Sequence, residues 1–250
     1  MNKRNKWLRL VIQHTPLFWR VPRELRLRVW MRLAINQELG FAYIRIPKAA
    51  NSTVAKTLAL RAYPGQRTTI EADPRGSEAK NLFQSISPLR CPTRRCLQRR
   101  YYTFTFVRHP YTRLLSAYLD KVTSDYSQQK KGWERRSSHW SVDQGTSFEA
   151  FVTSLEQGNL CANIHWAPQT IICPVALRDL DFVGRVENLE HDLTTVTERL
   201  FGTTALELIG QREHNRQNAN DKLDQYYTPA LRKRVFRLYR EDFEQLGYDP

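Results

Sequence analysis

The sequence has little of what a membrane-spanning or disulfide-rich protein needs. The longest uncharged run in the N-terminal region, residues 10–19, contains Gln, His and Pro, and it is far too short to cross a bilayer. No segment before it resembles a secretory signal peptide. The four cysteines, Cys91, Cys96, Cys161 and Cys173, match no zinc motif, and Cys161 with His165 supplies only two ligands. These absences predict a soluble, cytoplasmic protein with free thiols.

Acidic side chains are also scarce relative to basic ones. The 25 Asp and Glu are outnumbered by 39 Lys and Arg, which gives a formal net charge of +14. Residues 1–40 hold nine basic and two acidic side chains, and residues 90–136 hold twelve and three. Such an excess favours a polyanionic ligand or an anionic polysaccharide. A nucleic-acid-binding module is the weaker interpretation, because the arginines form no known recognition element.

The first strand–turn–helix segment predicts an anion site, although the chain lacks the glycine-rich G-x-x-x-x-G-K-[ST] loop of nucleotide-binding kinases and ATPases. Residues 41–46 are β-branched and aromatic enough for a strand. Residues 51–63 predict a helix with Val54, Leu58 and Ala62 on one face and Ser/Thr at its start. The turn between them, residues 47–53 (PKAANST), directs backbone amides, the helix N-terminus and Lys48 to one place. An ordinary capped helix with a solvated lysine explains this segment equally well.

A second segment of the same kind favours the anion site. Residues 101–107 predict a strand, and a helix follows through residue 122 with Pro110 in its first turn. Arg108 stands at the carboxyl end of the strand, where open α/β sheets bind ligands. Ser116 lies one to two turns into the helix, near enough to share an anion with Arg108. Two such turns predict that one ligand with two phosphate groups is bound.

These two segments carry a family resemblance. Residues 47–53 resemble the 5′-phosphosulfate loop of sulfotransferases, and residues 106–118 (FVRHPYTRLLSAY) resemble their 3′-phosphate motif, F-V-R-D-P-x-x-R-L-x-S-A-Y. The likeness is greatest to family 2 carbohydrate sulfotransferases of the chondroitin 4-O and HNK-1 type. Further stretches match in family order: 164–168 (IHWAP), 181–189 (DFVGRVENL), 226–229 (YYTP) and 242–248 (DFEQLGY).

The resemblance implies transfer of a sulfuryl group from 3′-phosphoadenosine-5′-phosphosulfate (PAPS) to a hydroxyl of a carbohydrate acceptor. It implies that Lys48 stabilises the leaving phosphate and that no metal is needed. Arg108 and Ser116 would hold the 3′-phosphate. The 5′-phosphate would be held by the loop residues Lys48, Ala49, Ala50, Asn51, Ser52 and Thr53. A kinase-like transferase that binds a nucleotide phosphate is the alternative.

The acceptor hydroxyl must lose a proton, so a general base is expected. His165 lies in the matching stretch 164–168 and is the preferred candidate, with a structural histidine packed on Trp166 as the equal alternative. The other candidate histidines are His14, His109, His139, His191 and His214, and a carboxylate base is also possible. The polar loop 212–218 around His214 is more simply a solvated loop than one that closes over the substrate or the nucleotide. His109 departs from the family pattern, which has Asp or Asn there. Its side chain either points away from the phosphate or makes a pH-sensitive contact.

The expected fold is α/β: a single domain with a central, mostly parallel sheet flanked by helices, like the P-loop-like sulfotransferase fold. Residues 41–250 form this domain, and residues 1–40 form a basic N-terminal segment with an amphipathic helix over 23–35. That helix either docks on the domain or lies on an anionic membrane surface. Residues 124–146 predict a polar loop near the acceptor. A C-terminal helix begins at Thr228 and Pro229 and runs past Phe243.

Overall fold

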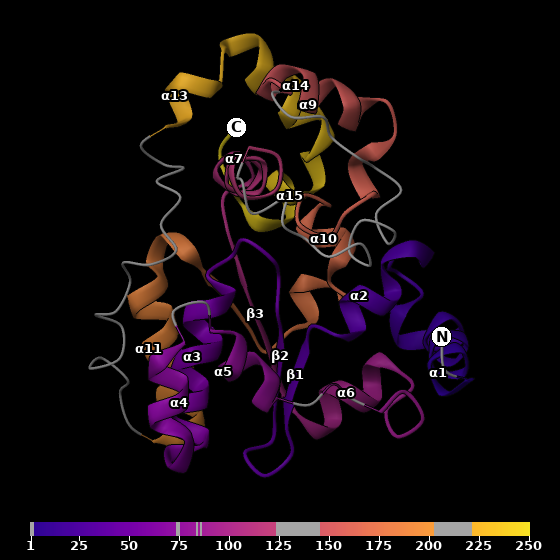
Figure 1. The fold of residues 1–250 in the computed structure, drawn as a ribbon, viewed down its shortest axis with the longest axis vertical. Helices are drawn as coiled ribbons and strands as arrows, with labels where there is room; N and C mark the ends of the chain where they lie inside the picture. The colour runs from indigo at the N-terminus through magenta and orange to yellow at the C-terminus, as the bar shows by residue number, and fades with distance from the viewer. Residues whose placement is uncertain (1–2, 74–75, 84, 86, 124–145, 203–221) are drawn as a thin grey trace. The chain divides into compact units, whose positions relative to one another are not determined.

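The computed structural model describes residues 3–73, 76–83, 85, 87–123, 146–202 and 222–250. The polar loop expected over 124–146 lies outside the described residues except for Thr146, and the loop 212–218 with His214 lies wholly outside them. The chain divides into two compact units. The first contains Met1–Val107 and Cys173–Arg216, and the second contains Arg108–Ile172 and Gln217–Pro250. Figure 1 traces the fold along the chain.

A four-stranded sheet lies in the first unit, in the order β1-β2-β3-β4. Its strands are β1 (Leu33–Asn36), β2 (Phe41–Ile44), β3 (Tyr102–Val107) and β4 (Phe182–Arg185). β2, β3 and β4 run parallel, and β1 pairs antiparallel with β2. Parallel neighbours require crossover connections, and helices supply them between β2 and β3 and between β3 and β4. The expected α/β fold with a mostly parallel sheet flanked by helices is confirmed.

Helices of the first unit flank this sheet. They are α1 (Lys3–His14), α2 (Arg26–Trp30), α3 (Asn51–Ala62), α4 (Arg67–Ala72), α5 (Ser77–Leu82), α6 (Arg94–Arg100) and α11 (Leu189–Phe201). In Figure 1, α3, α4, α5 and α11 lie on one side of the strands, and α1, α2 and α6 lie on the other. Single 3₁₀ turns add η1 (Pro16–Phe18), η2 (Arg23–Leu25), η3 (Pro64–Gln66), η6 (Leu177–Asp179) and η7 (Val186–Asn188).

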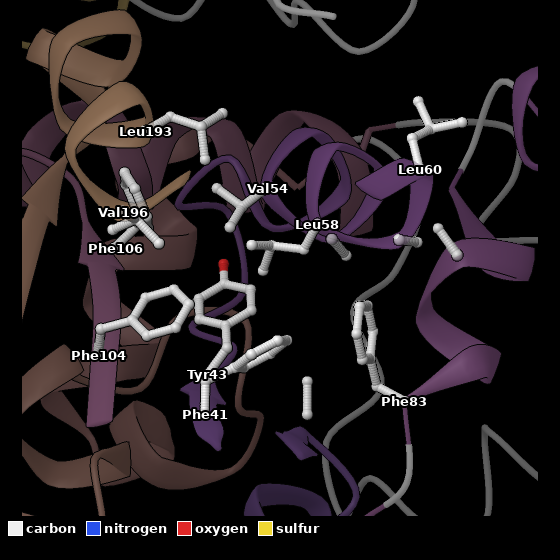
Figure 2. Packing of buried hydrophobic residues seen from close by; sticks show 14 of the residues in the cluster. Phe41, Tyr43, Val54, Leu58, Leu60, Phe83, Phe104, Phe106, Leu193 and Val196 are labelled. Carbon is white, nitrogen blue, oxygen red and sulfur yellow. The ribbon is translucent and has the colours of Figure 1, made fainter. Parts of the chain in front are cut away.

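An aromatic core lies between the sheet and the helices α3, α5 and α11. Tyr43 of β2 stacks on Phe104 of β3, with ring centroids 5.1 Å apart and planes 9° from parallel. Figure 2 shows Val54 and Leu58 of α3 above these rings, with Leu193 of α11 nearby. All five side chains are buried. This packing fixes α3 on the sheet, and therefore the loop that leads into it.

Gly184 in β4 is required by the packing of Phe106. A Cβ atom built on Gly184 would lie 2.5 Å from Phe106 Cε1, inside van der Waals contact. Gly184→Ala is therefore expected to lower the free energy of unfolding by about 1–3 kcal/mol, measured by urea denaturation. Gly65→Ala is the control, because nothing lies within 4 Å of its added Cβ atom. Equal stability of Gly184→Ala and the wild type would contradict this packing.

The prediction of one helix over residues 23–35 is wrong after Trp30. The chain forms η2 and α2 as far as Trp30, and Leu33–Asn36 then becomes strand β1, opposite β2. The apolar residues Leu33 and Ile35 fit the spacing of a helix as well as the alternation of a strand, and hydrogen bonding to β2 stabilises the strand. Ile12 of α1 and Val29 of α2 are buried, so part of the N-terminal segment packs within the first unit. No helix among the described residues is long and apolar enough to span a membrane.

The second unit is helical. It contains α7 (Pro110–Lys121), α9 (Phe148–Glu156), η5 (Asn159–Cys161), α10 (Gln169–Ile172), α13 (Leu223–Tyr226), α14 (Pro229–Leu238) and α15 (Arg240–Leu246). Thr228 caps α14 by accepting the Leu231 amide at 3.2 Å, as expected. The prediction of a single C-terminal helix is wrong, because α14 ends at Leu238 and a separate helix, α15, begins after Tyr239. The buried Tyr239 hydroxyl donates to the Trp166 carbonyl, and α15 then buries Asp242 and Phe243.

The four cysteines are free, as expected. Cys91 and Cys173 are buried, and burial raises the pKa of each thiol to about 12, since it disfavours the charged thiolate. Cys96 and Cys161 are partly exposed. At pH 8 iodoacetamide is therefore expected to modify Cys96 and Cys161 well before Cys91 and Cys173, as followed by peptide mass spectrometry. Equal rates at all four would contradict the burial of the first pair.

Candidate functional site

The loop between β2 and α3 has an unusual backbone. Lys48 and Ala50 have positive φ angles of 67° and 50°, and no other non-glycine residue in the described part of the chain has one. A left-handed conformation costs about 1–2 kcal/mol for a residue with a Cβ atom. Such strain collects at ligand sites, and alternating left-handed residues turn successive amides into an anion-binding concavity. The backbone of this loop therefore favours the anion site over an ordinary capped helix.

The N-terminus of α3 is left open to a ligand. Ala50 occupies the N-cap position and offers no side-chain hydrogen bond, so the expected Ser/Thr cap is wrong. The first intrahelical bond runs from the Val54 amide to the Ala50 carbonyl at 3.0 Å. The amides of Asn51, Ser52 and Thr53 precede that bond and have no acceptor within the helix. An anion placed there would accept these donors and meet the positive end of the helix dipole.

A second ammonium group reaches this loop from α5. Lys80 Nζ donates a hydrogen bond to Ser52 Oγ at 2.7 Å. Gly76 allows the approach, because a Cβ atom there would lie 3.2 Å from the Ser52 carbonyl oxygen. The sequence did not predict Lys80 as a site residue, because Lys80 lies 28 residues after Ser52 and belongs to no motif. Only the packing of α5 on α3 brings the two together.

The second predicted phosphate segment begins immediately after β3. Arg108 is half-buried, and its Nε donates to Thr112 Oγ1 at 3.0 Å. Thr112 lies in the first turn of α7, four residues before Ser116, so the two hydroxyls share one helix face. Ser116 is only 3% exposed. Arg108 thus lies against the start of the helix that carries Ser116, and Thr112 is a hydroxyl that sequence reasoning missed.

His109 caps α7 and contacts the C-terminal residues. Its Nδ1 accepts the Tyr111 amide at 3.3 Å, and its Nε2 lies 3.1 Å from the Asp249 carbonyl oxygen. These partners require a neutral ring with the proton on Nε2. The ring packs on Tyr248 and Phe243, with centroids 5.0 and 5.5 Å away. His109 therefore serves as an N-cap in place of the family's Asp, since a neutral Nδ1 accepts as a carboxylate does.

His165 is held in one tautomer by Asn163. Asn163 Oδ1 accepts the His165 backbone amide at 3.1 Å and lies 2.8 Å from His165 Nδ1. Because this oxygen only accepts, Nδ1 carries the ring proton, and the lone pair of the neutral ring is on Nε2. A proton acceptor on a half-buried side chain is what a general base needs. Asn163, two residues earlier, was missed because nothing in the sequence marks it as a partner.

The stretch around His165 is anchored by buried polar groups. Arg113 is 1% exposed and donates to the carbonyls of Ala167 at 2.9 Å and Ile164 at 3.4 Å. Burial lowers the pKa of Arg113, and the charge of Asp242 partly offsets that effect. Trp166 is also buried, and its indole N–H donates to the Asn159 carbonyl at 3.0 Å. The motif residues Arg113 and Trp166 therefore hold His165 in place without reacting themselves.

The two compact units divide the predicted site residues between them. Lys48, Ala49, Ala50, Asn51, Ser52 and Thr53 belong to the first unit, and Arg108, Ser116 and His165 belong to the second. Within the ranges that the structure describes, no three His, Cys, Asp or Glu side chains gather as a metal site. The chemistry available is therefore anion binding at two strand ends and proton acceptance by a histidine.

Known proteins resemble this chain along most of its length. A model described as "Sulfotransferase family" matches residues 31–249. Carbohydrate sulfotransferase 14 of Danio rerio is 26% identical over 243 residues, covering 92% of this chain and 65% of that protein. The Homo sapiens protein of the same name is 26% identical over 241 residues, covering 92% and 63%. Carbohydrate sulfotransferase 11 of Rattus norvegicus is 21% identical over 237 residues, covering 86% and 66%.

The chain spans less than two thirds of the length of these relatives. No solved structure matches it at a significant level.

Proposed function

Because the chain belongs to the sulfotransferase family, we propose that it transfers a sulfuryl group from PAPS to a hydroxyl of a carbohydrate acceptor. The observation that carries this proposal is the left-handed loop at Lys48 and Ala50, together with the N-terminus of α3, which has no side-chain cap and could bind an anion. The class of acceptor follows the names of the relatives, which are carbohydrate sulfotransferases.

The donor's two charged ends have separate binding segments in this proposal. The loop amides and the hydroxyls of Ser52 and Thr53 hold the 5′-phosphate, with Lys48 and Lys80 supplying positive charge. Arg108 and Ser116 hold the 3′-phosphate. Charge-assisted hydrogen bonds to phosphate are about twice as strong as neutral ones, which makes these cations the main source of affinity.

The reaction is an in-line displacement. The acceptor oxygen forms a bond to sulfur as the bond from sulfur to the 5′-phosphate oxygen breaks, and His165 Nε2 takes the acceptor's proton. The products are a sulfate ester and 3′-phosphoadenosine 5′-phosphate (PAP). By analogy with phosphoryl transfer, catalysis rests on positioning and on stabilising the charge of the leaving phosphate. Lys48 supplies that stabilisation, so no step in this scheme calls on a metal ion.

Contact with an anionic membrane surface is proposed for residues 1–40. Trp7 and Trp19 are 53% and 65% exposed, and the neighbouring side chains of Arg9 and Arg20 are also exposed. Aromatic and basic side chains together favour binding to anionic lipids. The cytoplasmic location expected from the sequence stays a prediction.

Isothermal titration calorimetry with PAP, ATP and a DNA duplex tests the proposed donor. PAP is expected to bind at least about tenfold more tightly than ATP, because only PAP presents a 3′-phosphate to Arg108. A kinase-like enzyme would prefer ATP, and a nucleic-acid-binding protein would prefer the duplex. Equal affinity for PAP and ATP would overturn the proposed function.

A further inference from the structure

The backbone of Arg108 is held by one buried side chain, Gln169 of α10. Gln169 Oε1 accepts the Arg108 amide at 2.9 Å, and Gln169 Nε2 donates to the Arg108 carbonyl at 2.8 Å. Both main-chain polar groups of one residue are therefore satisfied by one carboxamide, as a neighbouring strand would satisfy them. Gln169 is 0% exposed, so water does not compete for these bonds.

Gln169 is in turn held by Asp242 of α15. Asp242 Oδ2 accepts a hydrogen bond from the backbone N–H of Gln169 at 2.8 Å, and it lies 3.5 Å from the side-chain Nε2 of Gln169. Asp242 Oδ1 accepts the Thr170 amide at 2.9 Å and the Thr170 hydroxyl at 2.8 Å. Asp242 is 0% exposed, and a buried carboxylate is tolerated only with such donors around it. The carboxylate thus fixes the start of α10 and the direction of the Gln169 side chain.

The side chain of Arg108 is fixed from another direction. Its Nε donates to Thr112 Oγ1, and Thr112 Oγ1 donates to the His109 carbonyl at 3.0 Å. With the main chain held by Gln169 and the first guanidinium nitrogen held by Thr112, the orientation of the guanidinium is set before any ligand arrives. Pre-organised donors bind an anion more tightly, since less conformational freedom is lost on binding.

We infer that Gln169, anchored by Asp242, is a positioning residue that holds Arg108 in the geometry needed to bind the 3′-phosphate of the donor. This inference rests on the proposed function. It gives a role to Asp242 of the motif stretch DFEQLGY, whose part in the reaction was open, and to Gln169, the residue that follows the stretch IHWAP. Neither Gln169 nor Asp242 contacts the donor in this scheme, because both are fully buried and act through Arg108.

A double-mutant cycle tests this role. Affinities for PAP and for AMP, which lacks the 3′-phosphate, are measured by calorimetry in the wild type, Gln169→Leu, Arg108→Ala and the double variant. Gln169→Leu removes both bonds to Arg108 and is expected to weaken PAP binding by about tenfold. AMP binding is expected to change by less than about twofold. In the Arg108→Ala background, Gln169→Leu is expected to cause no further loss, because its effect passes through Arg108.

Further variants keep the test decisive if Gln169→Leu folds poorly. Gln169→Glu keeps an acceptor for the Arg108 amide and loses the donor to the carbonyl, so an intermediate loss of PAP affinity is expected. Gln157→Leu, at an exposed position of the same unit, is the matched control and is expected to bind PAP normally. Thermal unfolding by circular dichroism checks that each variant is folded.

The outcomes separate the inference from the function on which it rests. Equal weakening of PAP and AMP binding, or the same loss with and without Arg108, would give Gln169 a merely structural role and overturn the inference. The proposed function would survive that result. A wild-type protein that binds PAP no better than AMP would overturn the function and the inference together.

Discussion

Lys48→Ala is expected to lower the rate of sulfuryl transfer by about 100- to 1,000-fold, because the leaving phosphate loses the cation that stabilises its developing charge. The substitution tests charge cleanly. Lysine and alanine both carry a Cβ atom, so the left-handed backbone at this position meets the same steric cost in the variant. The measurement is the initial rate of labelled-sulfate transfer at saturating donor.

Two variants serve as controls for Lys48. Lys56→Ala removes an ammonium from α3, the helix that follows the Lys48 loop, and is expected to keep wild-type activity. The Lys56 ammonium donates to the Glu71 carbonyl at 3.3 Å. Lys48→Arg retains the charge with a different shape and is expected to recover only part of the rate. Normal transfer by Lys48→Ala would remove Lys48 from the catalytic site.

His165→Ala is expected to reduce turnover by about 100- to 10,000-fold, the usual contribution of a general base, and to leave PAP binding unchanged. Because a general base accepts a proton only when it is deprotonated, protonation of the base is expected to lower the wild-type rate at acidic pH. That acid limb should disappear in His165→Ala. The pH profile of turnover, from pH 5 to 9, is the measurement.

Asn163 supplies the matched variant for His165. Asn163→Ala removes the acceptor that keeps the ring proton on Nδ1, and it is expected to lower turnover by about tenfold with the acid limb retained. A carboxylate base would give a different result. In that case the acid limb would persist in His165→Ala, and the role given to His165 would be wrong.

Much of the fold could be predicted because it depends on local pattern. The strands at 41–46 and 101–107 and the helices after them follow from β-branched runs and from helical spacing of apolar residues. The two predictions that were wrong concern segments whose structure depends on contacts with residues distant in the sequence. Leu33–Asn36 is a strand only because β2 lies beside it, and the C-terminal helix breaks where Tyr239 reaches the Trp166 carbonyl.

The residues of the candidate site also fall into those that the sequence predicts and those that it does not. Lys48, Arg108, Ser116 and His165 stand in motifs that family resemblance identifies. Their supporting residues stand in no motif position with a known role, because support depends on three-dimensional packing. Lys80 meets Ser52 across 28 residues, and Asp242 meets Gln169 across 73. Asn163 is close in sequence to His165, yet its role depends on a side-chain direction that spacing does not encode.

Transfer of labelled sulfate from PAPS to a panel of glycans, with small alcohols and lipids included, tests the central claim most directly. The wild-type protein is expected to label at least one glycan and to release PAP in equal amount, and Lys48→Ala is expected to label it at least about 100-fold more slowly. Labelling of an alcohol or lipid alone would keep the transfer reaction and contradict the carbohydrate acceptor. A folded wild-type protein that neither binds PAPS nor transfers its label to any acceptor would contradict the proposed function.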